Sequence, residues 1–174
     1  RRVVLSLDSF AASRQPLNGN TPQSVWRNML RAGAGCRPSL SATDDHRMRV
    51  AGSLAFTQDM VHTLAGNYFF TSSMMGNTLT RAGQDFNQDV TFEGSGEWTL
   101  TDSLHVEYFL YFRSGIFRTN DQAINTNFFW ANTRDVRELY FGNSHITVES
   151  RNNIYYYSEM QLSADNLTFD AGTS

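Results

Sequence analysis

Two groups of acidic residues are the first candidates for chemistry in this 174-residue chain. One is the run at residues 44–46, two aspartates and a histidine, and the other is a series at intervals of four, Asp85, Asp89 and Glu93. Acid–base hydrolysis needs two carboxylates, or an acid with a basic partner, clustered on one face. On a strand the series shares a face but extends over about 26 Å, too far for a carboxylate pair. We therefore interpret both groups as solvated turn residues and predict no catalytic residue and no enzyme activity.

Residues that bind metals or cofactors do not form a recognisable motif. The four histidines, His46, His62, His105 and His145, are scattered singly, without the spacing of metal ligands. A glycine-rich phosphate loop, a nucleophile elbow and a paired cysteine motif are all missing from the sequence. The one cysteine, Cys36, has no partner for an internal disulfide. We predict no metal and no cofactor, and expect each histidine to face outward from a strand.

Aromatic residues offer the other chemistry, stacking on a sugar ring. They cluster at residues 128–130 and 155–157. Successive side chains of a strand point to opposite faces, so Phe129 and Tyr156 should point away from their neighbours. Trp130 and Tyr156 are the candidates for ligand stacking. The alternative, which we favour, is that these clusters fill a hydrophobic core.

Charge and hydropathy exclude two classes of partner. The formal net charge is −3, and all 14 basic residues are arginines. A nucleic-acid surface needs a basic patch or stripe, so we predict no nucleic-acid partner. The sequence contains no run near the ~18 apolar residues of a membrane helix, so we predict no membrane span.

A sequence repeat indicates which secondary-structure elements position these residues. Apolar residues alternate with polar ones after a glycine or aspartate in four stretches, residues 52–56, 76–80, 96–100 and 165–169. The motif heads recur at a mean spacing of about 22 residues, a period typical of solenoids. Residues 52–60 and 96–104 agree in apolar or polar character at each position. The pattern predicts short strands whose apolar faces are buried against neighbouring coils.

We therefore predict an all-β fold, a right-handed parallel β-helix of roughly eight coils of about 22 residues. It forms one segment over residues 1–174, less regular at 1–45, with residues 21–33 open to either helix or strand. Strands should pair in parallel one coil apart, as in Leu54 with residues near Leu79. The predicted buried core is Leu54, Phe56, Phe70, Leu79, Phe86, Phe92, Trp98, Leu100, Phe117, Ile124, Leu139, Phe141, Ile146, Val148, Leu167 and Phe169.

The stretches 66–73, 90–104, 115–124, 132–134, 139–148 and 166–174 carry a family resemblance. They resemble the repetitive β-solenoid regions of large secreted surface proteins of Bacteroidetes-type bacteria, commonly exported by the type IX secretion system. Several arginines depart from that pattern. Because an unpaired buried charge is costly, either these arginines face solvent, or the strand register is wrong, or the sequence was partly inferred rather than read from a gene. The arginines are Arg27, Arg31, Arg47, Arg49, Arg113 and Arg137.

The resemblance implies a non-catalytic structural or adhesive segment, located outside the cell or on its surface. Its expected partners are further coils of the same long chain, neighbouring surface proteins, the secretion machinery or glycans. We expect the sequence to be a piece of a longer chain. Residues 102–104 resemble the O-glycosylation acceptor motif of these bacteria, which makes Ser103 a candidate site. The alternative is a carbohydrate-binding or carbohydrate-degrading β-helix.

Overall fold

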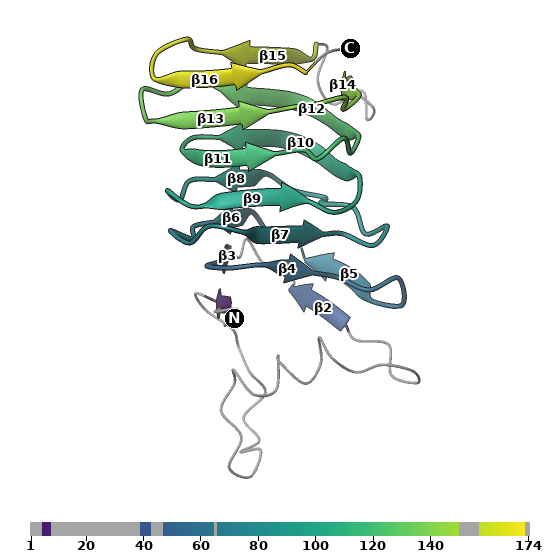
Figure 1. Ribbon diagram of the computed structural model, residues 1–174. Helices are drawn as coiled ribbons and strands as arrows, with labels where there is room; N and C mark the ends of the chain where they lie inside the picture. The colour runs from purple at the N-terminus through teal and green to yellow at the C-terminus, as the bar shows by residue number, and fades with distance from the viewer. Residues whose placement is uncertain (1–4, 8–38, 43–46, 65, 150–156, 173–174) are drawn as a thin grey trace.

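The protein is an all-β solenoid built from stacked parallel strands. The computed structural model describes residues 5–7, 39–42, 47–64, 66–149 and 157–172, and every regular element in them is a strand (Figure 1). The predicted all-β class and the parallel β-helix are thereby confirmed. The question of helix or strand at residues 21–33 lies outside the described residues.

Two sheets form the long walls of the solenoid (Figure 1). The larger contains β1 (Leu5–Leu7), β3 (Met48–Val50), β6 (Tyr68–Phe70), β8 (Val90–Phe92), β10 (Leu104–Phe112), β12 (Ile124–Ala131), β14 (Ile146–Val148) and β15 (Glu159–Leu162). The smaller contains β4 (Leu54–Ala55), β7 (Asn77–Thr80), β9 (Glu97–Leu100), β11 (Gly115–Arg118), β13 (Arg137–Tyr140) and β16 (Leu167–Asp170). A separate pair joins β2 (Ser39–Ala42) to β5 (Val61–Leu64).

Strand pairing follows the predicted register. Leu54 lies beside Leu79, and Trp98 lies beside Phe117, each pair in parallel strands. Among the described strands, the pairing of β1 with β3 is the one antiparallel contact. The coil length varies with the loops: the chain needs 19 residues from Trp98 to Phe117 but 30 from Leu139 to Phe169. The smaller sheet stacks six strands, and the predicted count of eight coils stays a prediction.

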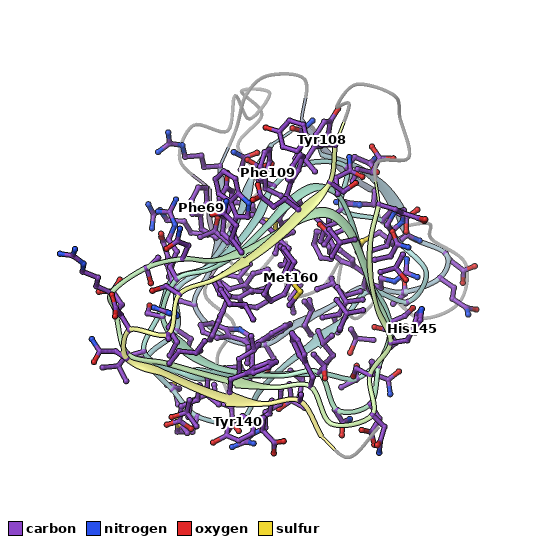
Figure 2. The ribbon with its side chains drawn as sticks, turned by 90° about the horizontal axis from the view of Figure 1, so that it is seen from above. Phe69, Tyr108, Phe109, Tyr140, His145 and Met160 are labelled. Atoms are coloured by element: carbon purple, nitrogen blue, oxygen red, sulfur yellow. The ribbon has the colours of Figure 1, made fainter. Side chains whose placement is uncertain are left out.

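Inward side chains form columns along the solenoid axis because parallel in-register strands place equivalent positions above one another. One column runs from Tyr68 through Val90, Leu110 and Phe129 to Met160. Seen along the axis, Met160 lies near the middle of the coil (Figure 2). The core is therefore a continuous stack of side chains.

The predicted core is largely correct. Twelve of its sixteen residues, from Leu54 to Phe141, are buried, and Ile146, Val148 and Leu167 are partly buried against them. Phe169 is the exception at 44% exposure, because it belongs to the last rung and no further strand covers it. Trp98 is fully buried, so the inward and outward positions of the repeat were assigned correctly.

The arginines divide between surface and interior. Arg47 is exposed, and Arg49 and Arg113 lie partly exposed on the outer wall. Solvent exposure, one of the alternatives given for Arg137, does not hold, since this residue is 1% exposed. Its guanidinium donates to the main-chain oxygens of Thr133 and Asp135 and, at 2.6 Å, of Ser163. These carbonyls replace the water that a buried cation loses, although burial still lowers the pKa of Arg137. Arg27 and Arg31 lie outside the described residues.

Candidate functional site

The outer surface of the larger sheet carries a cluster of aromatic rings, which we call the outer aromatic face. Its members are Phe69, Phe109, Tyr111 and Trp130, which are partly exposed, and Phe128, whose ring packs among them and is itself buried at 1% exposure. Phe69 of β6 and Tyr111 of β10 both pair with Thr91 of β8, so the two rings lie on the rungs on either side of Thr91. Trp130 of β12 pairs with Tyr111. Phe109 lies beside Phe128 in the neighbouring column. Phe69 and Phe109 both point away from the core on this side of the coil (Figure 2).

Trp130, a predicted stacking residue, lies within this cluster. Its ring meets Phe109 edge-on at 5.2 Å and Tyr111 at 5.7 Å between centroids. Its neighbour Phe129 is fully buried in the core, so the expected alternation of faces is confirmed at that position. Phe109 and Phe128 stack at 4.4 Å with an interplanar angle of 12°. The rings therefore hold one another in fixed orientations.

The second predicted stacking residue, Tyr156, lies outside the described residues. Its neighbour Tyr157 is 65% exposed and contacts Phe128 edge-on at 5.6 Å. Trp130 is half-buried, and its indole nitrogen is covered. This nitrogen has no hydrogen-bond partner in the described part of the chain.

Guanidinium groups border the rings at one end of the face. Arg47 and Arg49 lie over the ring of Phe69 at 5.8 and 5.4 Å from its centroid. Arg113 lies over Tyr111 at 5.4 Å. A guanidinium above a ring is attracted by the negative charge of the π face. In the sequence these arginines stood out only as departures from a pattern. The ring partner of Arg47 and Arg49 lies one coil away, whereas that of Arg113 lies two residues away in the chain.

Asp89 adds a carboxyl group to the same wall. Its Oδ1 accepts a hydrogen bond from the main-chain N–H of Phe109 at 3.3 Å. Burial raises the pKa of Asp89, since removal from water disfavours the charged form. The other two acids of the four-residue series have different partners. Asp85 contacts Arg81 and His105, and Glu93 contacts Arg49 and Arg113. The series therefore forms no carboxylate pair.

Ser103, the candidate glycosylation residue, lies in a polar turn cluster that sequence analysis missed. Its Oγ accepts a hydrogen bond from Arg81 Nη2 at 3.0 Å. Arg81 Nη1 also donates to Asp85 Oδ1 at 2.5 Å, and His105 Nδ1 contacts the same oxygen at 2.9 Å. Ser103 is thus half-buried and already hydrogen-bonded. The spacing of the two residues could have predicted this contact, because Arg81 and Ser103 are separated by one coil length in the sequence.

A similar network crosses the outer surface of the smaller sheet, around Tyr140 (Figure 2). Arg118 lies 4.0 Å from the Tyr140 ring centroid, and its Nε donates to Glu97 Oε1 at 2.6 Å. This hydrogen bond from Arg118 lowers the pKa of Glu97. Tyr140 donates its hydroxyl hydrogen to Glu138 at 2.8 Å, which raises the tyrosine pKa. Each carboxylate is engaged within the protein.

The histidines do not all face outward. His105 and His145 lie on the surface, whereas His62 is buried, and the prediction was wrong there. His62 Nδ1 donates to the main-chain oxygen of Asp85 at 3.0 Å, and Tyr68 donates its hydroxyl hydrogen to Nε2. Burial lowers the pKa of His62. His46 and its acidic neighbours lie outside the described residues.

The described side chains contain no group of three or more histidine, cysteine, aspartate or glutamate residues able to hold a metal ion. Within the same part of the chain, no helix has the length and apolar character needed to cross a membrane. What the described surface does offer is aromatic rings and guanidinium groups. Proteins use these groups to bind planar, ring-shaped or anionic ligands. No protein-family model, curated protein or solved structure matches this chain.

Proposed function

We propose that the protein is a non-catalytic structural and adhesive segment of a secreted bacterial surface protein, exported by the type IX system and located outside the cell. The supporting observation is the last rung, β15 and β16, where Met160, Leu162 and Phe169 are 39%, 38% and 44% exposed. These residues continue the core columns of Phe129, Ala131 and Leu139. A stacking coil would bury them as the inner coils bury theirs.

Backbone edges at the last rung favour the same interpretation. β16 pairs with β13 on one side, and β15 pairs with β12 on one side. An edge strand presents unpaired N–H and C=O groups that can pair with an additional strand. The proposed partners are therefore further coils of the same chain or a neighbouring surface protein. Right-handed winding, the usual hand of parallel crossovers, and a total of roughly eight coils are part of this proposal.

Association of the purified protein tests the structural role. We expect concentration-dependent association by sedimentation velocity, and its loss when Met160 and Phe169 are both replaced by glutamate. Met75→Glu is the matched control, since Met75 is 58% exposed but lies between β6 and β7, away from the last rung. Equal association of all three proteins would contradict the proposal. Release of new reducing ends from a panel of polysaccharides would contradict the non-catalytic assignment.

A carbohydrate-binding function is the second candidate, and the outer aromatic face favours it. Trp130 and Tyr111 lie side by side on adjacent rungs, about 4.8 Å apart along the axis. Aromatic rings held in this way provide an apolar surface on which a sugar ring can stack. A glycan array tests the assignment: we expect binding that Trp130→Ala abolishes and that Met75→Glu leaves unchanged. Polysaccharide cleavage together with binding would identify the carbohydrate-degrading alternative.

A further inference from the structure

One end of the outer aromatic face carries more positive than negative charge, and we call it the arginine strip. It consists of Arg47, Arg49 and Arg113 with the rings of Phe69 and Tyr111, and Glu93 lies between two of the arginines. Arg49 pairs with Phe69 across β3 and β6. Glu93 and Arg113 follow the next strands, with their main-chain N–H groups bonded to Phe70 and Phe92. The strip therefore crosses successive rungs in the direction of the solenoid axis.

The single carboxylate in the strip is shared by two arginines. Arg49 Nη1 lies 3.2 Å from Glu93 Oε1, and Arg113 Nη1 lies 3.9 Å from Glu93 Oε2. The strip as defined thus holds three guanidinium groups and one carboxylate, which contacts two of them. Exposed ion pairs of this kind contribute only ~0–1 kcal/mol, so a ligand anion can compete for the guanidinium groups.

The guanidinium groups remain accessible. The side chains of Arg49 and Arg113 are 40% and 48% exposed, although the chain as a whole is acidic. Each guanidinium has five N–H donors in a planar fork, and Glu93 engages few of them. The rings of Phe69 and Tyr111 lie under the guanidinium carbons of Arg49 and Arg113. The N–H donors that Glu93 does not engage can donate to a ligand. A carboxylate matches the edge of the fork in shape and can accept two parallel N–H bonds from it.

We propose that the arginine strip binds an acidic polysaccharide, one that carries carboxylate groups along its length, laid along the solenoid axis. The inference rests on the adhesive part of the proposed function, because it names the ligand class for that role. Arg49 lies on β3 and Arg113 follows β10, three rungs further along the axis, so the strip presents cations at separate points of an extended polymer that carries carboxylates along its length. Beyond Arg113 the same wall continues into the Tyr111 and Trp130 rings and the amides of Asn132 and Gln161. Rings and amides suit the ring faces and hydroxyl groups of sugars better than they suit a polyanion without sugar rings.

A pair of polymers that differ only in charge tests the ligand class. Polygalacturonate and its fully methyl-esterified form share one backbone, and the ester lacks the carboxylates. We expect polygalacturonate in the gel to retard the migration of the protein in affinity electrophoresis. Binding to the ester should be weaker by roughly tenfold or more. The affinity for polygalacturonate should fall as salt rises, because the contacts are between exposed charges.

Variants locate the site. Replacement of Arg49 and Arg113 by glutamine should weaken polygalacturonate binding roughly tenfold or more, and replacement of both by lysine should restore part of it. Arg118→Gln is the matched control, since Arg118 also stacks on a tyrosine and pairs with a glutamate, but on the smaller sheet. It should leave binding unchanged. Thermal unfolding of each variant shows that the solenoid is intact.

Several outcomes overturn the inference. Equal binding of the methyl ester would show that charge is not recognised, and would leave the neutral carbohydrate-binding candidate. Equal binding of polyglutamate or single-stranded DNA would show that the ligand need not be a polysaccharide. Binding that survives the glutamine variants would place the site elsewhere. Absence of binding to all these polymers would also overturn it, while the association measured for Met160 and Phe169 would continue to test the structural role separately.

Discussion

The same repeat motif occupies two different environments, one in the middle of the solenoid and one in its last rung. In β9, Trp98 and Leu100 are essentially fully buried. In β16, Leu167 and Phe169 occupy the corresponding inward positions, yet Leu167 is half-buried and Phe169 is 44% exposed. Both strands pair in parallel with the rung before them. Burial in this fold is therefore supplied by the coil on each side and is not a property of the motif itself.

Polar contacts differ between these two regions in the same way. Glu97 of β9 accepts hydrogen bonds from the Gly76 main-chain N–H at 3.0 Å and from Arg118 at 2.6 Å, so it links three rungs. Asp170 of β16 accepts instead from Gly172, two residues further along the chain. Contacts between rungs require order in two coils at once, whereas a contact within one turn does not. The middle of the solenoid should thus be the more stable region.

The largest expected effect is at Trp98. Trp98→Ala removes a fully buried indole that packs against Phe70, Phe92 and Phe117, so we expect a loss of ~3–5 kcal/mol in the free energy of unfolding. Urea denaturation monitored by circular dichroism measures it. Trp98→Phe is the milder control, because it keeps an aromatic ring and deletes a buried N–H that has no partner among the described atoms. A loss below ~1 kcal/mol for the alanine variant would show that inner rungs do not depend on stacking.

A second test uses two glycines with similar backbone angles. Gly115 has φ +90°, and a Cβ there would meet the carbonyl oxygens of Gly94 and Gly96 at 2.3 and 2.5 Å. Gly83 has φ +84°, and a Cβ there would meet nothing within 4 Å. Gly83→Ala should cost only the backbone strain of ~1–2 kcal/mol, and Gly115→Ala should cost clearly more. An equal loss of stability for the two variants in thermal unfolding would mean that neighbouring rungs separate easily. It would contradict the expectation that the middle of the solenoid is the more stable region.

Acidification should act on the coils around β5, which carries His62, and spare the last rung. Burial lowers the pKa of His62 in the folded protein below the value of about 6.5 expected in the unfolded chain. The unfolded state then binds more protons, so stability is complete above pH 6.5 and declines as the pH falls below it. Hydrogen exchange should show protection decreasing first around Tyr68 and Phe86, which contact His62. His145→Gln should leave this pH dependence unchanged, because His145 is exposed.

The smallest effect is expected at Phe169. Phe169→Ala removes a ring that contacts Phe141 on one side and is otherwise largely exposed, so the loss should be ~1 kcal/mol or less. Urea denaturation at low protein concentration, where the chain is monomeric, measures it. A loss as large as that of Trp98→Ala would show that the last rung is covered in solution, and the two environments would not differ.

Much of the candidate site followed from strand periodicity, and part of it did not. Alternation predicted that Phe129 and its neighbour Trp130 point to opposite faces, but not which of the two enters the core; the structure places Phe129 there. The contacts of Trp130 with Phe109 and Tyr111 could not be predicted. They depend on the pairing of β10 with β12, whose register shifts between Val106 and Phe109. A shift of this kind leaves no recognisable mark in the local sequence.

The sequence by itself determined the parallel solenoid and the inward positions of the repeat, since both depend on local alternation and a recurring motif. Only the tertiary structure decided which coils meet, because the coil length along the smaller sheet ranges from 19 residues between Trp98 and Phe117 to 30 between Leu139 and Phe169. That choice of neighbours places Arg49 over Phe69, buries His62 against Tyr68 and surrounds Arg137 with carbonyl oxygens. It also leaves Phe169 exposed, because burial of an inward residue requires a coil above it as well as below.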